Sequence, residues 1–88
     1  MSYQSLIAYK KSFDLAMKIF RTTKSFPKDE IFGLTNQMRR SSRAVCSNVC
    51  EGYRKRIYQA HFITKLTDAD MENTETEVWL DFALAVNL

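Results

Sequence analysis

Residues 59–86 read QAHFITKLTDADMENTETEVWLDFALAV, a stretch without glycine or proline that decides the fold class. On a helical wheel at about 100° per residue, its apolar side chains fall on two separate faces. A helix with two apolar faces needs two sets of neighbours, and two further helices of one chain cover the second set only in part. The first face comprises Phe62, Leu66, Ala69, Leu80, Ala83 and Leu84, and the second comprises Met71, Val78, Phe82 and Ala85.

Two more helices are predicted upstream of this segment. The first covers about residues 6–25 and ends before Pro27, because the residue that precedes a proline is disfavoured in the α region. The second covers about residues 34–54. Two glycines and one proline in 88 residues leave few places to turn, which favours a few long helices over many strands. We therefore expect an all-α, antiparallel up-and-down helical bundle with three long helices, in which residues 1–88 form a single domain.

The expected packing of the second helix combines an apolar stripe with several small residues. Ser41, Ser42 and Gly52 would let a neighbouring helix approach closely, and Gly52 costs about 1 kcal/mol relative to alanine within a helix. The expected core stripe of this helix is Leu34, Met38, Val45, Val49 and Tyr53, and that of the first helix is Leu6, Tyr9, Phe13, Ala16, Met17 and Phe20.

The formal net charge of +3 hides an asymmetry along the chain. Residues 1–56 carry twelve of the thirteen Lys and Arg against four acids, a net charge of +8. Residues 57–88 carry one Lys against six acids, a net charge of −5. Such a split is typical of a nucleic-acid surface on one half. It also describes an acidic helix that packs against basic ones, and folding requires only this second arrangement.

Basic side chains of the second helix are candidates for contacts with nucleic-acid phosphates. They occur in the middle of the helix and again at its end, and several phosphate contacts on one surface would make binding strongly salt-dependent. The alternative is that these side chains pair with acids of the third helix or of another subunit, and the sequence favours neither. The candidate nucleic-acid-binding residues are Arg39, Arg43, Arg54, Lys55 and Arg56.

No combination of residues predicts catalysis, a cofactor or a metal site. The acids of the third helix lack the Glu-x-x-His pairs of di-iron bundles, and His61 is the sole histidine. Cys46 and Cys50 lie four apart on one helix, where disulfide geometry is rarely reached, so they are interpreted as small, partly buried apolar residues. No apolar run approaches the roughly 18 residues of a membrane span, and no signal-peptide pattern follows Met1. We expect no enzyme, no membrane association and a cytoplasmic location.

Three motifs occur in order along the chain: FPKDE at 26–30, FGLTNQMRR at 32–40 and SNVCEGY at 47–53. Together they resemble the bacterial four-helix-bundle family of the 23S rRNA intervening-sequence proteins. This family also includes the accessory variability determinant of diversity-generating retroelements. The resemblance extends from about Leu6 to Leu84, with the order and spacing of the motifs intact.

The resemblance implies a four-helix bundle that assembles as a homopentamer. In the retroelement branch it further implies a basic surface that binds RNA or DNA and the reverse transcriptase, whereas the intervening-sequence branch has no known activity. Two features depart from the family pattern. Cys46 stands where the family usually has proline, and residues 1–88 hold no counterpart of the family's fourth helix, as expected either of a shortened member or of a fragment.

A polar stripe on the second helix completes the predicted sites. It lies well away from the core stripe on the wheel, so its side chains are expected to face outward and to form a polar subunit interface. The resulting hypothesis is a non-catalytic homo-oligomeric helical bundle, and the alternative is a nucleic-acid-binding accessory protein that uses the basic surface. The predicted interface residues are Gln37, Arg40, Asn48 and Glu51 of the stripe, with Met71, Val78 and Phe82 of the third helix.

Overall fold

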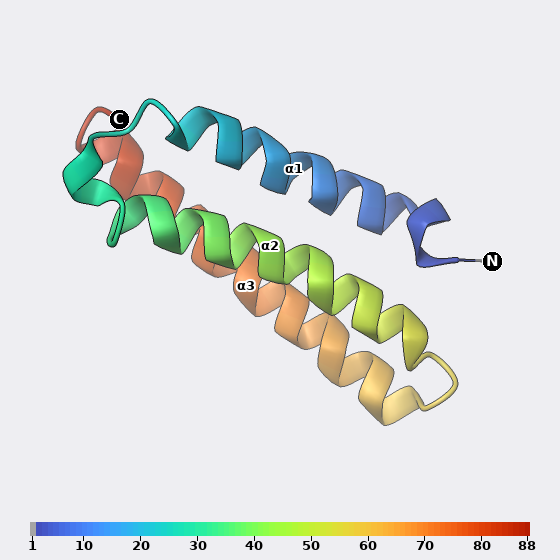
Figure 1. Cartoon of the computed structure of the whole chain (residues 1–88). Coiled ribbons are helices and arrows are strands. Elements are labelled where there is room, and N and C mark those ends of the chain that lie inside the picture. The colour runs from blue at the N-terminus through green and yellow to red at the C-terminus, as the bar shows by residue number, and fades with distance from the viewer. Residues whose placement is uncertain (1) are drawn as a thin grey trace.

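A computed structural model describes residues 2–88 of the chain, and Figure 1 shows its three long helices running antiparallel to their neighbours. The helices are α1 (Ile7–Thr23), α2 (Leu34–Arg54) and α3 (Gln59–Ala85), with short 3₁₀ segments η1 (Tyr3–Ser5) and η2 (Lys28–Glu30). Residues 2–88 contain no strand, so the prediction of an all-α up-and-down arrangement is confirmed.

The helix bounds lie close to the predicted ones, and α1 shows the largest difference. It begins at Ile7 and ends at Thr23, two residues before the predicted end. The amide of Phe26 donates to the carbonyl oxygen of Thr23 over 3.1 Å, so a tighter turn replaces the last predicted helical residues. This turn leads directly into Pro27, which cannot donate an amide hydrogen bond.

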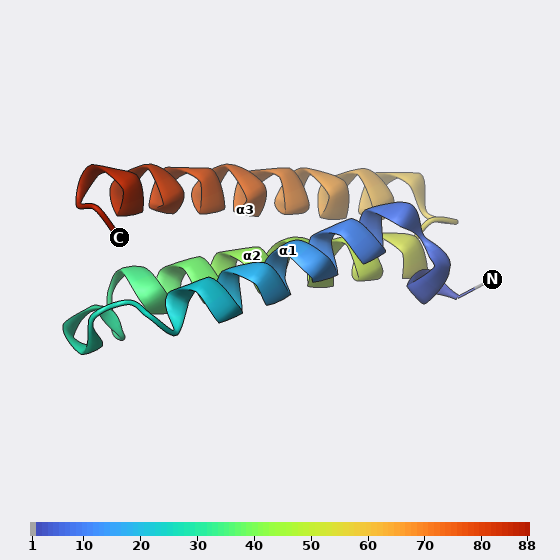
Figure 2. The ribbon, with the colours of Figure 1, turned by 90° about the horizontal axis from the view of Figure 1, so that it is seen from above.

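α2 is the central helix, and the other two pack on different sides of it. No Cα atom of α1 lies within 8 Å of a Cα atom of α3. Figure 2 shows α3 on one side of α2 while α1 overlies α2 in this view. α1 and α3 therefore each pack against α2, but their backbones do not approach each other. A groove of about 280 Å³ between the three helices is lined by Ile7, Val49, Phe62 and Leu66, among others.

The core is small and draws one residue from each helix. Ile19 of α1 is 4% exposed, Met38 of α2 is 1% exposed and Ala83 of α3 is 4% exposed. Phe26, Leu34 and Trp79 pack around this cluster and are only partly buried. The three helices thus share an apolar core near the end of the molecule where α1 and α3 terminate.

The buried stripes differ from the predicted ones, because small residues rather than large ones lie at the helix contacts. In α2, the predicted residues Val45, Val49 and Tyr53 are only half-buried, and Phe13 of α1 is exposed. Two helices can approach α2 closely only where its side chains are short, so large side chains lie at the edges of each contact. The buried residues of α1 are Ser12, Ala16, Ile19 and Thr23, and those of α2 are Thr35, Met38, Ser41, Ser42 and Gly52.

Gly52 and Ser41 mark the closest approach of α2 to α3. A Cβ atom placed on Gly52 would lie 3.3 Å from the Cβ atom of Lys65, which is tighter than ordinary van der Waals contact. The Thr76 hydroxyl oxygen lies 2.8 Å from the Ser41 hydroxyl oxygen and 2.9 Å from the carbonyl oxygen of Glu72. Close approach of this kind was the prediction made from the small residues of α2, and it is confirmed at Gly52 and Ser41.

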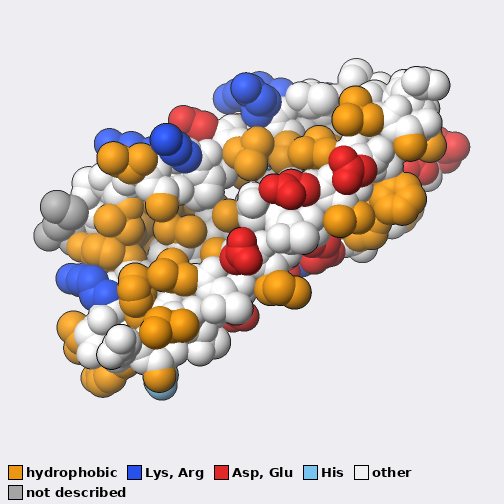
Figure 3. Space-filling model, turned by 180° about the vertical axis from the view of Figure 1, so that it is seen from behind, with side chains coloured by type: hydrophobic (Ala, Val, Ile, Leu, Met, Phe, Trp, Pro, Cys, Tyr) orange, Lys and Arg blue, Asp and Glu red, His pale blue; other side chains and the backbone are white. Residues whose placement is uncertain are grey.

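Much of the apolar surface of α3 is not covered within the described chain. Of the first predicted face, Ala69 and Ala83 are buried, whereas Leu84 is exposed. Of the second, Met71 is 65% exposed and Phe82 is 55% exposed. Figure 3 shows the molecule from behind, where hydrophobic side chains are exposed in several groups with acidic side chains between them. The sequence prediction that three helices leave apolar surface uncovered is therefore confirmed for α3.

Candidate functional site

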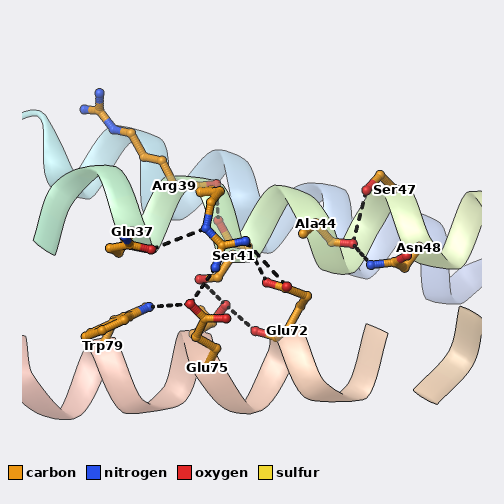
Figure 4. Close-up of polar contacts among 12 residues, drawn as sticks. Gln37, Arg39, Ser41, Ala44, Ser47, Asn48, Glu72, Glu75 and Trp79 are labelled. Carbon is orange, nitrogen blue, oxygen red and sulfur yellow. Dashed lines mark hydrogen bonds and ion pairs between the residues drawn. The ribbon is translucent and has the colours of Figure 1, made fainter. Parts of the chain in front are cut away.

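Arg40 connects α2 to α3 through a network of polar contacts, and Figure 4 labels four members of this network, Gln37, Glu72, Glu75 and Trp79. Its guanidinium pairs with the Glu75 carboxylate and with Oε2 of Glu72 at 3.2 Å, and its Nε donates to Oε1 of Gln37 at 3.3 Å. The indole Nε1 of Trp79 donates to Glu75 over 3.3 Å. The hydrogen bond from Arg40 lowers the pKa of the Glu75 carboxyl below its ordinary value and raises the pKa of Arg40 itself.

A second ion pair joins the same two helices. Lys65 Nζ lies 2.8 Å from Oε2 of Glu51. This hydrogen bond lowers the pKa of Glu51 and raises the pKa of Lys65. Asn48 bonds within α2, since its Nδ2 donates to the carbonyl oxygen of Ala44 over 2.9 Å.

In the predicted polar stripe of Gln37, Arg40, Asn48 and Glu51, the charged members are exposed, but each already has a partner within the chain. Arg40 and Glu51 both pair with α3 of the same chain. The physical reason is that α3 approaches α2 through Ser41 and Gly52, which places the neighbouring charged positions at the edge of that contact. A role for this stripe between subunits, and for Met71, Val78 and Phe82, stays a prediction.

Three cations surround one aromatic ring on the other side of α2. The Phe20 ring centroid lies 4.9 Å from Nζ of Lys24, 4.7 Å from Cζ of Arg39 and 5.6 Å from Cζ of Arg43. Nε of Arg39 donates to Oγ1 of Thr23 over 2.8 Å, which orients the guanidinium. No acid of residues 2–88 forms an ion pair with any of these three cations. We call Lys24, Arg39 and Arg43 around Phe20 the cation cluster.

The spacing of the residues explains how the cation cluster forms. Phe20 and Thr23 are three residues apart on α1, and Lys24 directly follows its last residue, four residues after Phe20. Arg39 and Arg43 are four apart on α2, so each set lies on one side of its helix. Figure 4 shows Arg39 projecting away from α3, on the opposite side from Glu72 and Glu75. Sequence reasoning identified Arg39 and Arg43 but missed Phe20, Thr23 and Lys24, whose helical spacing was the available signal.

The remaining predicted basic residues lie elsewhere. Arg43 and Arg54 are eleven residues apart on α2, about 16 Å at the α-helical rise. Cζ of Arg56 lies 4.0 Å from the Tyr53 ring centroid, and its Nη1 donates to the Tyr53 carbonyl oxygen over 2.8 Å. The five residues predicted to bind nucleic acid therefore form two separate groups rather than one.

An apolar groove of about 400 Å³ runs between α1 and α2 beside the cation cluster. The rings of Tyr9 and Phe13 are stacked with centroids 5.9 Å apart, and those of Tyr3 and Tyr9 meet edge to face at 5.0 Å. Burial, and then the neighbouring Cys46 thiol, raises the pKa of the Tyr9 hydroxyl, so this side chain is neutral. The groove is lined by Tyr3, Tyr9, Phe13, Met17, Cys46 and Cys50, with Arg43 at its edge.

Neither a metal cluster nor a membrane span is found in the described residues. No group of three or more His, Cys, Asp or Glu residues within 2–88 is placed to hold a metal ion. No helix in this range is long and apolar enough to cross a membrane.

Comparison with known proteins identifies the family. The description "23S rRNA-intervening sequence protein" belongs to a family whose profile matches residues 4–88. No curated protein and no solved structure shows significant similarity to the chain. The match covers all three helices, the cation cluster and every groove residue except Tyr3, and the family is not a known catalytic one. The chain therefore belongs to the 23S rRNA-intervening sequence protein family.

Proposed function

We propose that this protein is a non-catalytic, self-associating helical bundle. The observation that carries the proposal is that, within residues 2–88, far more apolar residues are exposed than buried. Five apolar residues are buried, whereas sixteen large ones are exposed, among them Met71, Val78 and Phe82 on one face of α3. Exposed apolar side chains that share one face, as Met71, Val78 and Phe82 do, are typical of surfaces through which proteins associate. A chain of this size also has a thin core of its own, and a second copy enlarges it.

Charge complementarity supports a second copy of the same chain as the partner. Asp70 and Asp81 of α3 form no ion pair within the described residues, and neither do Lys11 and Lys18 of α1. An α1 helix of one subunit can therefore neutralise an α3 helix of another. A homopentamer is the state implied by the family resemblance.

Light scattering coupled to gel filtration tests this proposal. We expect the wild-type protein to elute with the mass of several chains at micromolar concentration, and five is the expected number. Phe82→Asp should shift the mass towards a single chain, because it introduces a carboxylate into the apolar face. Lys28→Asp, which also adds a carboxylate at an exposed position but outside α1 and α3, is the control and should leave the mass unchanged. A wild-type protein that remains a monomer would refute the proposal.

Binding of nucleic acid is the second candidate function. It is favoured by the contrast between Arg40, which two carboxylates of α3 neutralise, and the cation cluster, which has no acidic partner in the described chain. Unpaired cations at fixed positions attract phosphates, and such binding weakens steeply with salt. A titration with labelled RNA across salt concentrations is the test. Absence of binding at low salt would contradict this function.

A further inference from the structure

We propose that the α1–α2 face holds one nucleotide unit of a single-stranded nucleic acid, with its phosphate at the cation cluster and its base in the adjoining groove. The proposal rests on the second candidate function, nucleic-acid binding, and adds a defined site and a preference for unpaired strands. Arg43 connects the two halves, because it both lies over the Phe20 ring and lines the groove.

The cation cluster has the chemistry of a phosphate site. Three like charges around one ring repel one another, and the ring face offsets only part of this repulsion. An oxyanion between them relieves it. Arg39 is also oriented beforehand, since Thr23 accepts from its Nε and its two terminal nitrogens remain for a ligand. Guanidinium groups held in this way suit the paired oxygens of a phosphate.

The groove has the chemistry of a base site. Tyr9 and Phe13 present stacked rings, and the lining includes the apolar side chain of Met17. The neutral Tyr9 hydroxyl and the cysteine side chains add no carboxylate that would repel the strand. Stacking of bases on aromatic side chains is tolerant of sequence. It requires a base that has left the duplex, so the groove selects single strands.

The size of the groove limits the ligand to one base at a time. A groove of about 400 Å³ is at the lower end of small-molecule sites. A free mononucleotide and one unit of a strand share the required chemistry, a planar base joined to a phosphate. The experiment therefore includes both.

Fluorescence anisotropy of a labelled single-stranded RNA, with the same sequence as a duplex for comparison, tests the site in the full chain. We expect the single strand to bind at least about tenfold more tightly than the duplex. Phe13→Leu retains apolar volume but removes the aromatic face, and we expect it to weaken single-strand binding roughly fivefold or more while duplex binding is unchanged.

The cation cluster is tested with a matched pair of lysines, Lys24 directly after the end of α1 and Lys11 within it. Lys24→Gln should weaken binding several-fold, whereas Lys11→Gln removes the same charge from a surface shared with Asp14 and Lys18 and should have little effect. Circular dichroism establishes that each variant folds. Equal effects of the two variants would show that only overall charge matters and would overturn the site.

Competition and thiol protection provide measurements that need no variant. Displacement of the strand by adenosine monophosphate supports the site and shows that a free nucleotide also fits. If inorganic phosphate displaces the strand equally well at the same concentration, the base contributes nothing and the base half of the proposal is overturned. Alkylation of Cys46 and Cys50 by iodoacetamide should slow when the strand is bound. An unchanged alkylation rate at saturation would place the strand elsewhere.

The possible failures are distinguishable. Equal binding of single strand and duplex, together with no effect of Phe13→Leu, refutes the base site but leaves nucleic-acid binding intact. No binding of either RNA at low salt refutes nucleic-acid binding itself.

Discussion

α2 packs against both α1 and α3, but the two contacts differ in their packing and in the pairing of their charges. Towards α3, α2 presents Gly52 and Ser41 at close range. The charges of Arg40 and Glu51 on this side of α2 are neutralised by ion pairs with α3. Towards α1, a groove remains open and Arg39 has no carboxylate partner within the described residues. The α2–α3 contact is thus closely packed and its charges are paired. The α1–α2 contact instead leaves a cation without a carboxylate partner and aromatic side chains along an open groove.

The adjacent residues Arg39 and Arg40 illustrate the difference between the two contacts of α2. They are adjacent in the sequence, but a rotation of about 100° per residue directs them to opposite sides of the helix. Arg40 meets the acids of α3, and Arg39 meets α1, which contains a single acid among several lysines. The function of an arginine in this protein therefore depends on which neighbouring helix it faces.

The largest expected effect comes from breaking the closely packed side. Gly52→Leu places a branched side chain where a Cβ atom alone would lie 3.3 Å from Lys65, so α3 must move away. We expect a loss of roughly 2–3 kcal/mol in the free energy of unfolding, measured by urea denaturation. Arg54→Leu, at an exposed position of the same helix, should change it little. Equal stability of the two variants would contradict the close α2–α3 contact.

The same substitution, threonine to valine, should change the free energy of unfolding in opposite directions at two positions. Thr76→Val removes the hydroxyl that contacts Ser41, which is fully buried, and should destabilise the fold by about 1–2 kcal/mol. The hydroxyl of Thr35 is buried with no hydrogen-bond partner among the described residues. Thr35→Val should therefore stabilise the fold by about 1 kcal/mol. Thermal unfolding of both variants is the measurement, and two shifts of the same sign would contradict the assigned contacts.

The smallest expected effect is the pH dependence of the α2–α3 ion pairs. Arg40 lowers the folded-state pKa of Glu75, so this pair contributes fully above the unfolded glutamate pKa of about 4.3 and is lost as pH falls through the folded-state pKa. Because both side chains are partly exposed, we expect a contribution of at most about 1 kcal/mol. Denaturation midpoints of Arg40→Gln should fall less on acidification than those of the wild type. Arg39→Gln, which loses no carboxylate partner, should follow the wild-type pH profile.

The helices and the uncovered surface of α3 could be predicted, whereas the partners of individual side chains could not. The bounds of α2 follow from local sequence, and the two apolar faces of α3 follow from its period. The wheel left the partner of Arg40 open, because it gives an angle around one helix but not the position of the next. Phe20 was assigned to a core stripe, although its ring serves as a platform for three cations.

The sequence by itself determined the helices, their order and the small residues that allow close packing, because these depend on local conformational preference and on periodicity. Only the tertiary structure decided that α1 and α3 do not meet, that Arg40 is neutralised, and that Lys24, Arg39 and Arg43 gather around Phe20. These features depend on the angles at which α1 and α3 pack against α2. Such angles arise from the combined shape of many side chains on different helices, which no single helical pattern contains.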